Sequence, residues 1–112
     1  MPGERLLPED PLTFIKACVD ERRILWTYHV NMRLEKRAIT RQMILDSTNT
    51  FEIIESYTED KYLPSYLVLA RQRTKVFHVL FATDVTNQNV RAVTAYYPSP
   101  ETWDGTFKRR SP

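Results

Sequence analysis

The apolar residues of this chain change their spacing near residue 50, and that change constrains the fold more than any other feature. Before Phe51 they recur every three or four residues, which is typical of amphipathic α-helices. After it, β-branched, aromatic and other apolar residues alternate with polar ones or form short continuous runs, as they do in β-strands. The sequence therefore predicts an α+β fold, with helices in the first half and a sheet in the second.

Three helices are expected before the sheet. The first covers about 11–23, because Pro11 suits the first turn of a helix and the apolar residues after it keep helical spacing. The second covers about 29–38. Thr40 is a plausible N-cap for a third, which ends at the polar run 47–50.

Four strands are expected after residue 50. Their connections are too short for crossover helices, so the strands should form an antiparallel meander with the helices packed on one face. The expected strands cover residues 51–57, 66–71, 76–82 and 90–97.

The chain is expected to form one domain. Its 112 residues are close to the usual size of a single domain, and they predict one hydrophobic core over 11–112. Residues 1–10 have no apolar periodicity and are expected to form a flexible leader. The tail, about 101–112, contains Trp103 and Phe107, which should dock it on the body.

The sequence predicts a cytoplasmic protein that does not enter a membrane. No apolar run approaches the roughly 20 residues that span a bilayer, and the first residues lack the apolar segment of a signal peptide. Cys18 is the only cysteine, so it cannot form an internal disulfide. It lies in an apolar helical pattern and is expected to pack in the core rather than act as a nucleophile.

Several chemistries are disfavoured. The only glycines are Gly3 and Gly105, which excludes a glycine-rich phosphate loop, and two histidines with one cysteine give no zinc-ligand spacing. Adjacent acidic pairs would diverge on regular elements. We therefore expect no metal and no cofactor.

The most informative polar pattern is His29, Arg33 and Arg37, spaced by four residues on the second expected helix. Residues at this spacing lie on one helical face. Arginine binds phosphate oxygens bidentately, and histidine transfers protons near neutral pH. The stripe therefore predicts a site for a phosphate-like ligand. The alternative is a solvated face whose arginines pair with Glu35 or other carboxylates.

Two residues of the expected sheet could complete such a site. His78 alternates with Val76 and Leu80, so the three should point to one face of the sheet. A structural histidine is the commoner outcome at such a position, but His78 could also form an acid–base pair with His29. Tyr96 offers a further hydroxyl donor.

The second half is more basic than the first. From Asp60 onward there are eight bases and four acids, although the whole chain carries a formal charge of only +2. This half could attract an RNA backbone or an acidic protein, and a solvated basic face is the alternative. The candidate binding residues are Arg71, Arg73, Lys108, Arg109 and Arg110.

Two short motifs give the chain a resemblance. His29, Arg33, Leu34, Arg37 and Ile39 form the first, and Thr94, Tyr96 and Pro98 form the second. Over residues 25–110 this pattern resembles a family of small bacterial proteins described as a domain of unknown function. That family in turn looks like a relative of the RelE and MqsR class of ribonuclease toxins, which are small α+β proteins often encoded beside an antitoxin.

The resemblance implies a toxin-like, metal-independent endoribonuclease that acts on mRNA and is silenced by a cognate antitoxin. His29 and His78 would exchange protons with the RNA, Arg33 and Arg37 would hold the phosphate, and Tyr96 would assist as a donor. The alternative is a non-catalytic module that binds RNA or an acidic protein with the same helix face. A structural subunit is a third possibility.

Overall fold

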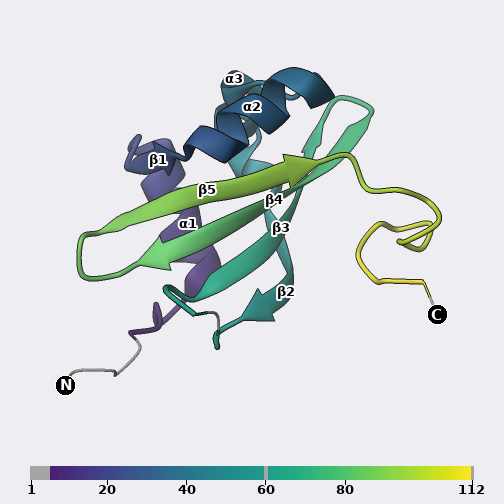
Figure 1. Cartoon of the computed structure of the whole chain (residues 1–112). Coiled ribbons are helices and arrows are strands. Elements are labelled where there is room, and N and C mark those ends of the chain that lie inside the picture. Colours follow the sequence, from purple (N-terminus) through teal and green to yellow (C-terminus); the bar gives the residue numbers. More distant parts are fainter. Residues whose placement is uncertain (1–5, 60, 112) are drawn as a thin grey trace.

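The helices precede most of the sheet along the chain, and the α+β class is confirmed (Figure 1). The computed structural model describes residues 6–59 and 61–111. In chain order the elements of these residues are α1 (Pro11–Asp20), β1 (Ile24–Trp26), α2 (Tyr28–Arg37), α3 (Arg41–Asp46), the short 3-10 helix η1 (Thr48–Thr50), β2 (Glu52–Tyr57), β3 (Ser65–Gln72), β4 (Lys75–Asp84) and β5 (Asn89–Tyr96).

The helices begin where the sequence predicts. Pro11 occupies the first turn of α1, and the Asp10 carboxylate caps that helix by accepting from the Thr13 amide. Thr40 caps α3 in the same way, through the Met43 amide at 3.0 Å. However, α1 ends at Asp20 rather than near residue 23, because Arg22 adopts a left-handed backbone conformation that turns the chain toward β1.

The expected four-stranded antiparallel meander is wrong in one respect, because the described sheet has five strands and is mixed. Its order is β1-β5-β4-β3-β2, in which β2 to β5 form the expected antiparallel meander. The additional strand, β1, pairs in parallel with β5, from Ile24 opposite Val90 to Trp26 opposite Ala92. Three residues are too few to show strand periodicity, so the pattern could not reveal this strand.

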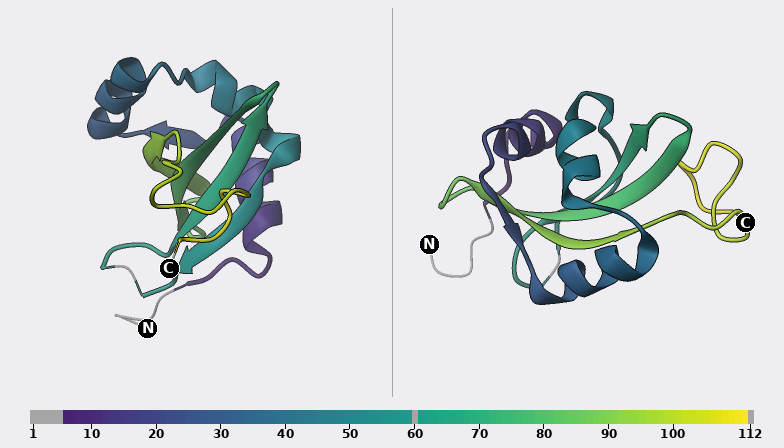
Figure 2. Two further views of the ribbon diagram at one scale, coloured as in Figure 1. Left: turned by 90° about the vertical axis from the view of Figure 1, so that its right-hand side faces the viewer. Right: turned by 90° about the horizontal axis from the view of Figure 1, so that it is seen from above.

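The core lies against one face of the sheet and takes buried side chains from all three α-helices, including Val30 and Leu34 of α2. Phe77, Val79 and Phe81 of β4 are fully buried there, together with Cys18 of α1. Burial raises the pKa of the Cys18 thiol, as expected for a core cysteine. The left view of Figure 2 shows α1 on one side of the sheet and the C-terminal tail on the other.

The second face of the sheet carries the candidate site, and we call it the open face. Side chains on it include those of Leu67, Leu80 and Thr94, which lie opposite one another on β3, β4 and β5. α2 packs along β5, where its buried Val30 and Leu34 join the same core, while its Arg33 reaches Thr94, so α2 also borders the open face (Figure 2).

Two further sequence predictions concern the N-terminal leader and membrane-spanning segments. Residues 1–5 of the predicted leader lie outside the described residues, and within the rest Pro8 is buried. No helix in the described part of the chain is long and apolar enough to cross a membrane.

Candidate functional site

The tail covers one end of the open face and fixes His78 beneath it. Trp103, which the sequence predicted to dock, is 2% exposed, and its ring meets the His78 ring edge to face at 4.5 Å. The tail folds back on itself through a bridge between Trp103 and Arg110. Phe107 lies at the turn of this segment with a positive φ of 59°.

Both ring nitrogens of His78 are hydrogen-bonded. Nε2 lies 2.8 Å from the Phe107 carbonyl oxygen, and Nδ1 lies 3.3 Å from the Tyr96 hydroxyl. A carbonyl can only accept, so Nε2 carries a proton. Burial lowers the pKa of His78, which keeps the ring neutral, so Nδ1 is the acceptor and Tyr96 is the donor. The tail carbonyl therefore selects the tautomer that accepts from Tyr96.

Tyr96 connects buried His78 to the surface. It lies directly opposite His78 in the register of β4 and β5. Burial raises the pKa of its phenol, so the hydroxyl stays protonated at neutral pH. With its hydrogen directed at His78, the oxygen keeps its lone pairs for a group outside.

Arg110 is held by a carboxylate from β2. Its Nε and one terminal nitrogen donate to the two Glu55 oxygens at 2.9 and 3.1 Å, and the guanidinium lies 4.7 Å from the Trp103 ring centroid. Tyr57 also donates to Glu55. Burial raises the pKa of the Glu55 carboxyl, but the hydrogen bonds from Arg110 and Tyr57 outweigh it and leave that pKa below its usual range. The same bond to Glu55 raises the pKa of Arg110.

These side chains surround a hollow of about 310 Å³, which we call the tail-side hollow. Leu67 and Leu80 provide its apolar surface. The polar groups at its wall come from β2, β5 and the tail, namely Tyr57, Thr94, Tyr96 and Arg110.

Two of the three residues of the predicted helix stripe reach β5 beside this hollow. Arg33 donates to the Thr94 hydroxyl at 3.0 Å, which places its guanidinium at the rim. Arg37 donates to the Ala95 carbonyl at 2.8 Å. The prediction that they share a helix face is confirmed, but both already have neutral partners on the sheet rather than carboxylates.

His29 is not paired with His78. It is exposed on the first turn of α2, where its ring meets that of Tyr28 at 5.9 Å. No contact between the two histidines is found among the described residues. A direct acid–base pair is excluded by the burial of His78, whose exposed fraction is 0% and whose two nitrogens already have partners.

The predicted basic residues do not form one surface. Arg110 alone among them lines the tail-side hollow, as far as the structure describes its lining. Arg71 and Arg73 lie at the β3–β4 turn, Lys108 pairs with Glu52 at 3.1 Å, and Arg109 is exposed. Their common charge in the sequence therefore did not imply a common site.

Three contributors were missed by the sequence analysis: Glu55, Tyr57 and the Phe107 carbonyl. One signal was available for the first two, because alternate residues of a strand point to the same face and both carry polar groups. No local signal indicates that a backbone carbonyl of the tail would meet His78.

A comparison with protein families places most of this architecture in a known group. A family model described as a domain of unknown function, DUF4258, matches residues 26–100. The chain belongs to the DUF4258 family. No curated protein and no solved structure matches the chain.

The DUF4258 match contains α2 and the four antiparallel strands, with Arg33, His78 and Tyr96. Trp103, Phe107 and Arg110 lie beyond it. The description of the family states no activity, so the resemblance to ribonuclease toxins stays a prediction. In this DUF4258 protein the described lining of the tail-side hollow is completed by Arg110, which lies outside the matched segment.

Proposed function

We propose that this protein is a toxin-like, metal-independent endoribonuclease that cuts mRNA at the tail-side hollow and is silenced by a cognate antitoxin. The observation that supports it best is the hydrogen-bonded series from Tyr96 through His78 to the Phe107 carbonyl, because Tyr96 at the start of this series lines the same hollow as Arg110. This supports the proposal because a phenol hydrogen-bonded to a histidine and a guanidinium, which is a group that binds phosphate, line one cavity.

The first step needs a base for the RNA 2′-hydroxyl. The Tyr96 oxygen accepts that proton while its own proton passes to Nδ1 of His78. The 2′-oxygen then attacks the adjacent phosphorus. His78 becomes an imidazolium; burial disfavours this charge, whereas the hydrogen bond to the Phe107 carbonyl and the negative charge of Glu55 favour it. Tyr96 touches the substrate in this scheme, and buried His78 acts through it.

The phosphorane formed by this attack carries extra negative charge. Arg110 meets it with a guanidinium whose direction Glu55 has already fixed, so little reorganisation is needed when the charge develops. Arg33, at the rim through Thr94, provides a second cation. Arg37 holds α2 against β5 rather than the phosphate.

The leaving 5′-oxygen needs a proton when the bond from phosphorus to that oxygen breaks. His29 is the candidate donor, because it precedes Arg33 by one turn on the same helix face and is open to solvent. The products are then a 2′,3′-cyclic phosphate and a 5′-hydroxyl. We call the Tyr96–His78 pair the relay. After cleavage, His78 returns its proton to Tyr96, and the Tyr96 hydroxyl releases a proton to solvent.

One observation favours the alternative, a non-catalytic RNA-binding module. His78 is fully buried, and exposed His29 lacks an orienting hydrogen bond among the described residues, whereas Arg33 and Arg110 are positioned as phosphate contacts would require. This alternative uses the same hollow but no proton transfer.

The test compares the wild type with His29→Gln and Arg33→Ala in the presence of a chelator. Cleavage of a labelled single-stranded RNA is measured beside binding by fluorescence anisotropy. We expect His29→Gln to bind RNA nearly as well as the wild type but to cut it at least 10²-fold more slowly, a typical contribution of a general acid. Arg33→Ala should lose affinity.

A wild type that binds RNA without cutting it would leave the binding module as the function. Induction in a bacterial host, at matched soluble expression, gives the cellular counterpart of this test. Growth arrest with fragmented RNA in the wild type, but not in His29→Gln, is the result expected of a toxin.

A further inference from the structure

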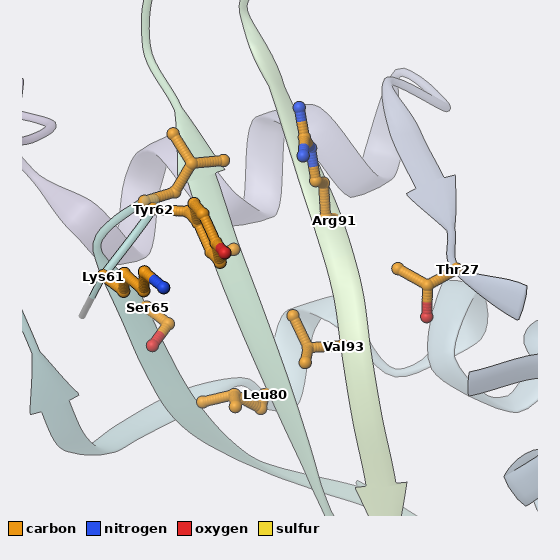
Figure 3. Close-up of a pocket in the computed structure, with 9 residues that line it drawn as sticks. Thr27, Lys61, Tyr62, Ser65, Leu80, Arg91 and Val93 are labelled. Carbon is orange, nitrogen blue, oxygen red and sulfur yellow. The ribbon is translucent and has the colours of Figure 1, made fainter. Parts of the chain in front are cut away.

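A second hollow lies beside the first on the open face, and we call it the loop-side hollow (Figure 3). Its volume is about 430 Å³. Leu80 lines both hollows, and the consecutive residues Val93 and Thr94 line one each. The two hollows therefore adjoin along β4 and β5, and together we call them the groove.

The walls of the loop-side hollow differ from its floor. Leu80, Ala82 and Val93 make the floor apolar. Tyr62, from the connection between β2 and β3, stands on one side and Arg91 of β5 on the other, as Figure 3 shows. Tyr62 is 80% exposed, and the Lys61 ammonium lies over one face of its ring at 5.3 Å from the centroid, so folding leaves the other flat face available beside an apolar floor.

The charged side chains that line the groove have one sign, and the carboxylate of Glu55, which pairs with Arg110, is not part of the described lining. The charged residues among the described lining of the two hollows are Lys61, Arg91 and Arg110, all cationic. The nearest partner of Arg91 is Asp84, at a loose 3.8 Å, and nearly half of the Arg91 side chain is exposed. A polyanion is therefore the ligand that this groove complements.

We propose that the loop-side hollow binds one nucleobase of the RNA strand, stacked on Tyr62 above Leu80 and Val93. A base has two apolar π faces and a polar edge, which matches an aromatic wall, an apolar floor and a guanidinium at the rim. This inference rests on the proposed function and extends it, because it assigns a subsite next to the scissile phosphate.

The hydrogen-bonding group at the base edge is Arg91 rather than Thr27. The Thr27 hydroxyl already donates to the Ala92 carbonyl at 3.3 Å and accepts from the Val30 amide at 3.1 Å, because it caps α2. Arg91 has donors to spare, and its side chain faces the hollow from the strand that also supplies Thr94 and Tyr96.

Two small probes separate a base site from a phosphate site. Adenosine carries the base without phosphate, and ribose 5-phosphate carries the phosphate without a base. In methyl-labelled full-length protein, Ala82 and Val93 report on the loop-side hollow, whereas Leu67 and Thr94 report on the tail-side hollow. We expect adenosine to shift the first pair and ribose 5-phosphate to shift the second.

The proposal is overturned if adenosine leaves Ala82 and Val93 unshifted, or if ribose 5-phosphate shifts them equally. This readout does not involve cleavage. Adenosine binding at the loop-side hollow in a protein that cuts no RNA would therefore support the base site while removing the nuclease.

A variant pair tests the stacking itself. Tyr62→Ala should weaken binding of a short single-stranded RNA by roughly 5- to 150-fold, the factor that corresponds to the loss of one stacked base. Tyr62→Phe keeps the ring and should bind nearly as the wild type does. The exposure of Tyr62 makes misfolding of either variant improbable as an explanation. Equal affinity of Tyr62→Ala and wild type would overturn the proposal even if the protein cuts RNA.

Discussion

Tyr96 donates its hydroxyl hydrogen to Nδ1 of His78 across two paired strands, and the two residues lie directly opposite each other in the sheet. This pair is the centre of the candidate site, since one member reaches the hollow and the other is sealed under Trp103. The pair can therefore exchange a proton with a ligand although His78 itself is inaccessible.

Replacing Tyr96 by Phe removes the relay and keeps the ring. On the proposed function we expect RNA cleavage to fall by about 10²- to 10⁴-fold. The unfolding free energy should fall by about 1–3 kcal/mol, because Nδ1 of His78 loses its partner in a buried site. Cleavage assays and urea unfolding measure the two effects.

Tyr97→Phe is the matched control for that change. In the wild type the Tyr97 hydroxyl donates to the Ala38 carbonyl at the surface rather than to His78. Tyr97→Phe should leave both the rate of RNA cleavage and the unfolding free energy close to those of the wild type. Equal cleavage by the Tyr96→Phe protein and the wild type would remove Tyr96 from the mechanism.

The buried histidine should make stability depend on pH. Burial lowers the pKa of His78 in the folded state below its ordinary value of 6.5, so the unfolded chain binds more protons near and below that pH. Stability therefore rises with pH in this window. We expect the His78 contribution to be complete above pH 6.5 and to be lost as the pH falls below it.

Urea unfolding of the wild type and His78→Gln over this range provides the measurement. The variant should be less stable at neutral pH, and its stability should fall less steeply on acidification. Parallel curves for the two proteins would mean that His78 does not cause the dependence.

The Glu55 carboxylate should matter through Arg110. Glu55→Gln weakens the hold on the guanidinium while keeping the shape of the side chain, so we expect several-fold weaker RNA binding. The loss of stability should be at most about 1 kcal/mol, because more than half of the Arg110 side chain is exposed. Anisotropy titrations and thermal unfolding measure these effects.

Glu52→Gln is the matched control, since Glu52 pairs with Lys108 of the same tail but does not line the described wall of the hollow. Its RNA affinity should match that of the wild type. If both variants bind RNA equally well, Arg110 does not contact the phosphate.

Arg33 should contribute one phosphate contact. For single-stranded RNA, each such contact changes the slope of log affinity against log salt by about 0.7. Arg33→Ala should therefore reduce the slope by that amount. Arg41→Ala removes the same charge from α3, where Arg41 donates to Asn31, and its slope should be unchanged. Identical slopes for all three proteins would count against Arg33 as an RNA ligand.

The sequence predicted the features of the fold that depend on residues close together in the chain. The helix starts at Pro11 and Thr40, the core position of Cys18 and the antiparallel order of the four long strands all follow from residues close in sequence. The common face of Arg33 and Arg37 was equally predictable, because helical geometry fixes it.

Long-range pairings were not predictable. Glu55 meets Arg110 across half of the chain, and β1 finds its partner in the last strand. Nothing in the residues around either partner specifies the other. The predicted pair of His29 and His78 was wrong for a different reason. Their chemistry suggested an acid–base pair, but Trp103 packs over His78 and keeps it buried.

The parallel pairing of β1 with β5 has a consequence for protein synthesis. A ribosome makes β1 early and β5 late, so a nascent chain that has reached β4 has neither a partner for β1 nor Tyr96. A complete sheet arises only after the last strand emerges, and the tail-side hollow is complete only when Arg110 of the tail has followed it. On the proposed function, a nascent chain that ends at β4 therefore lacks Tyr96 and Arg110 and is inactive until the rest of the chain is made.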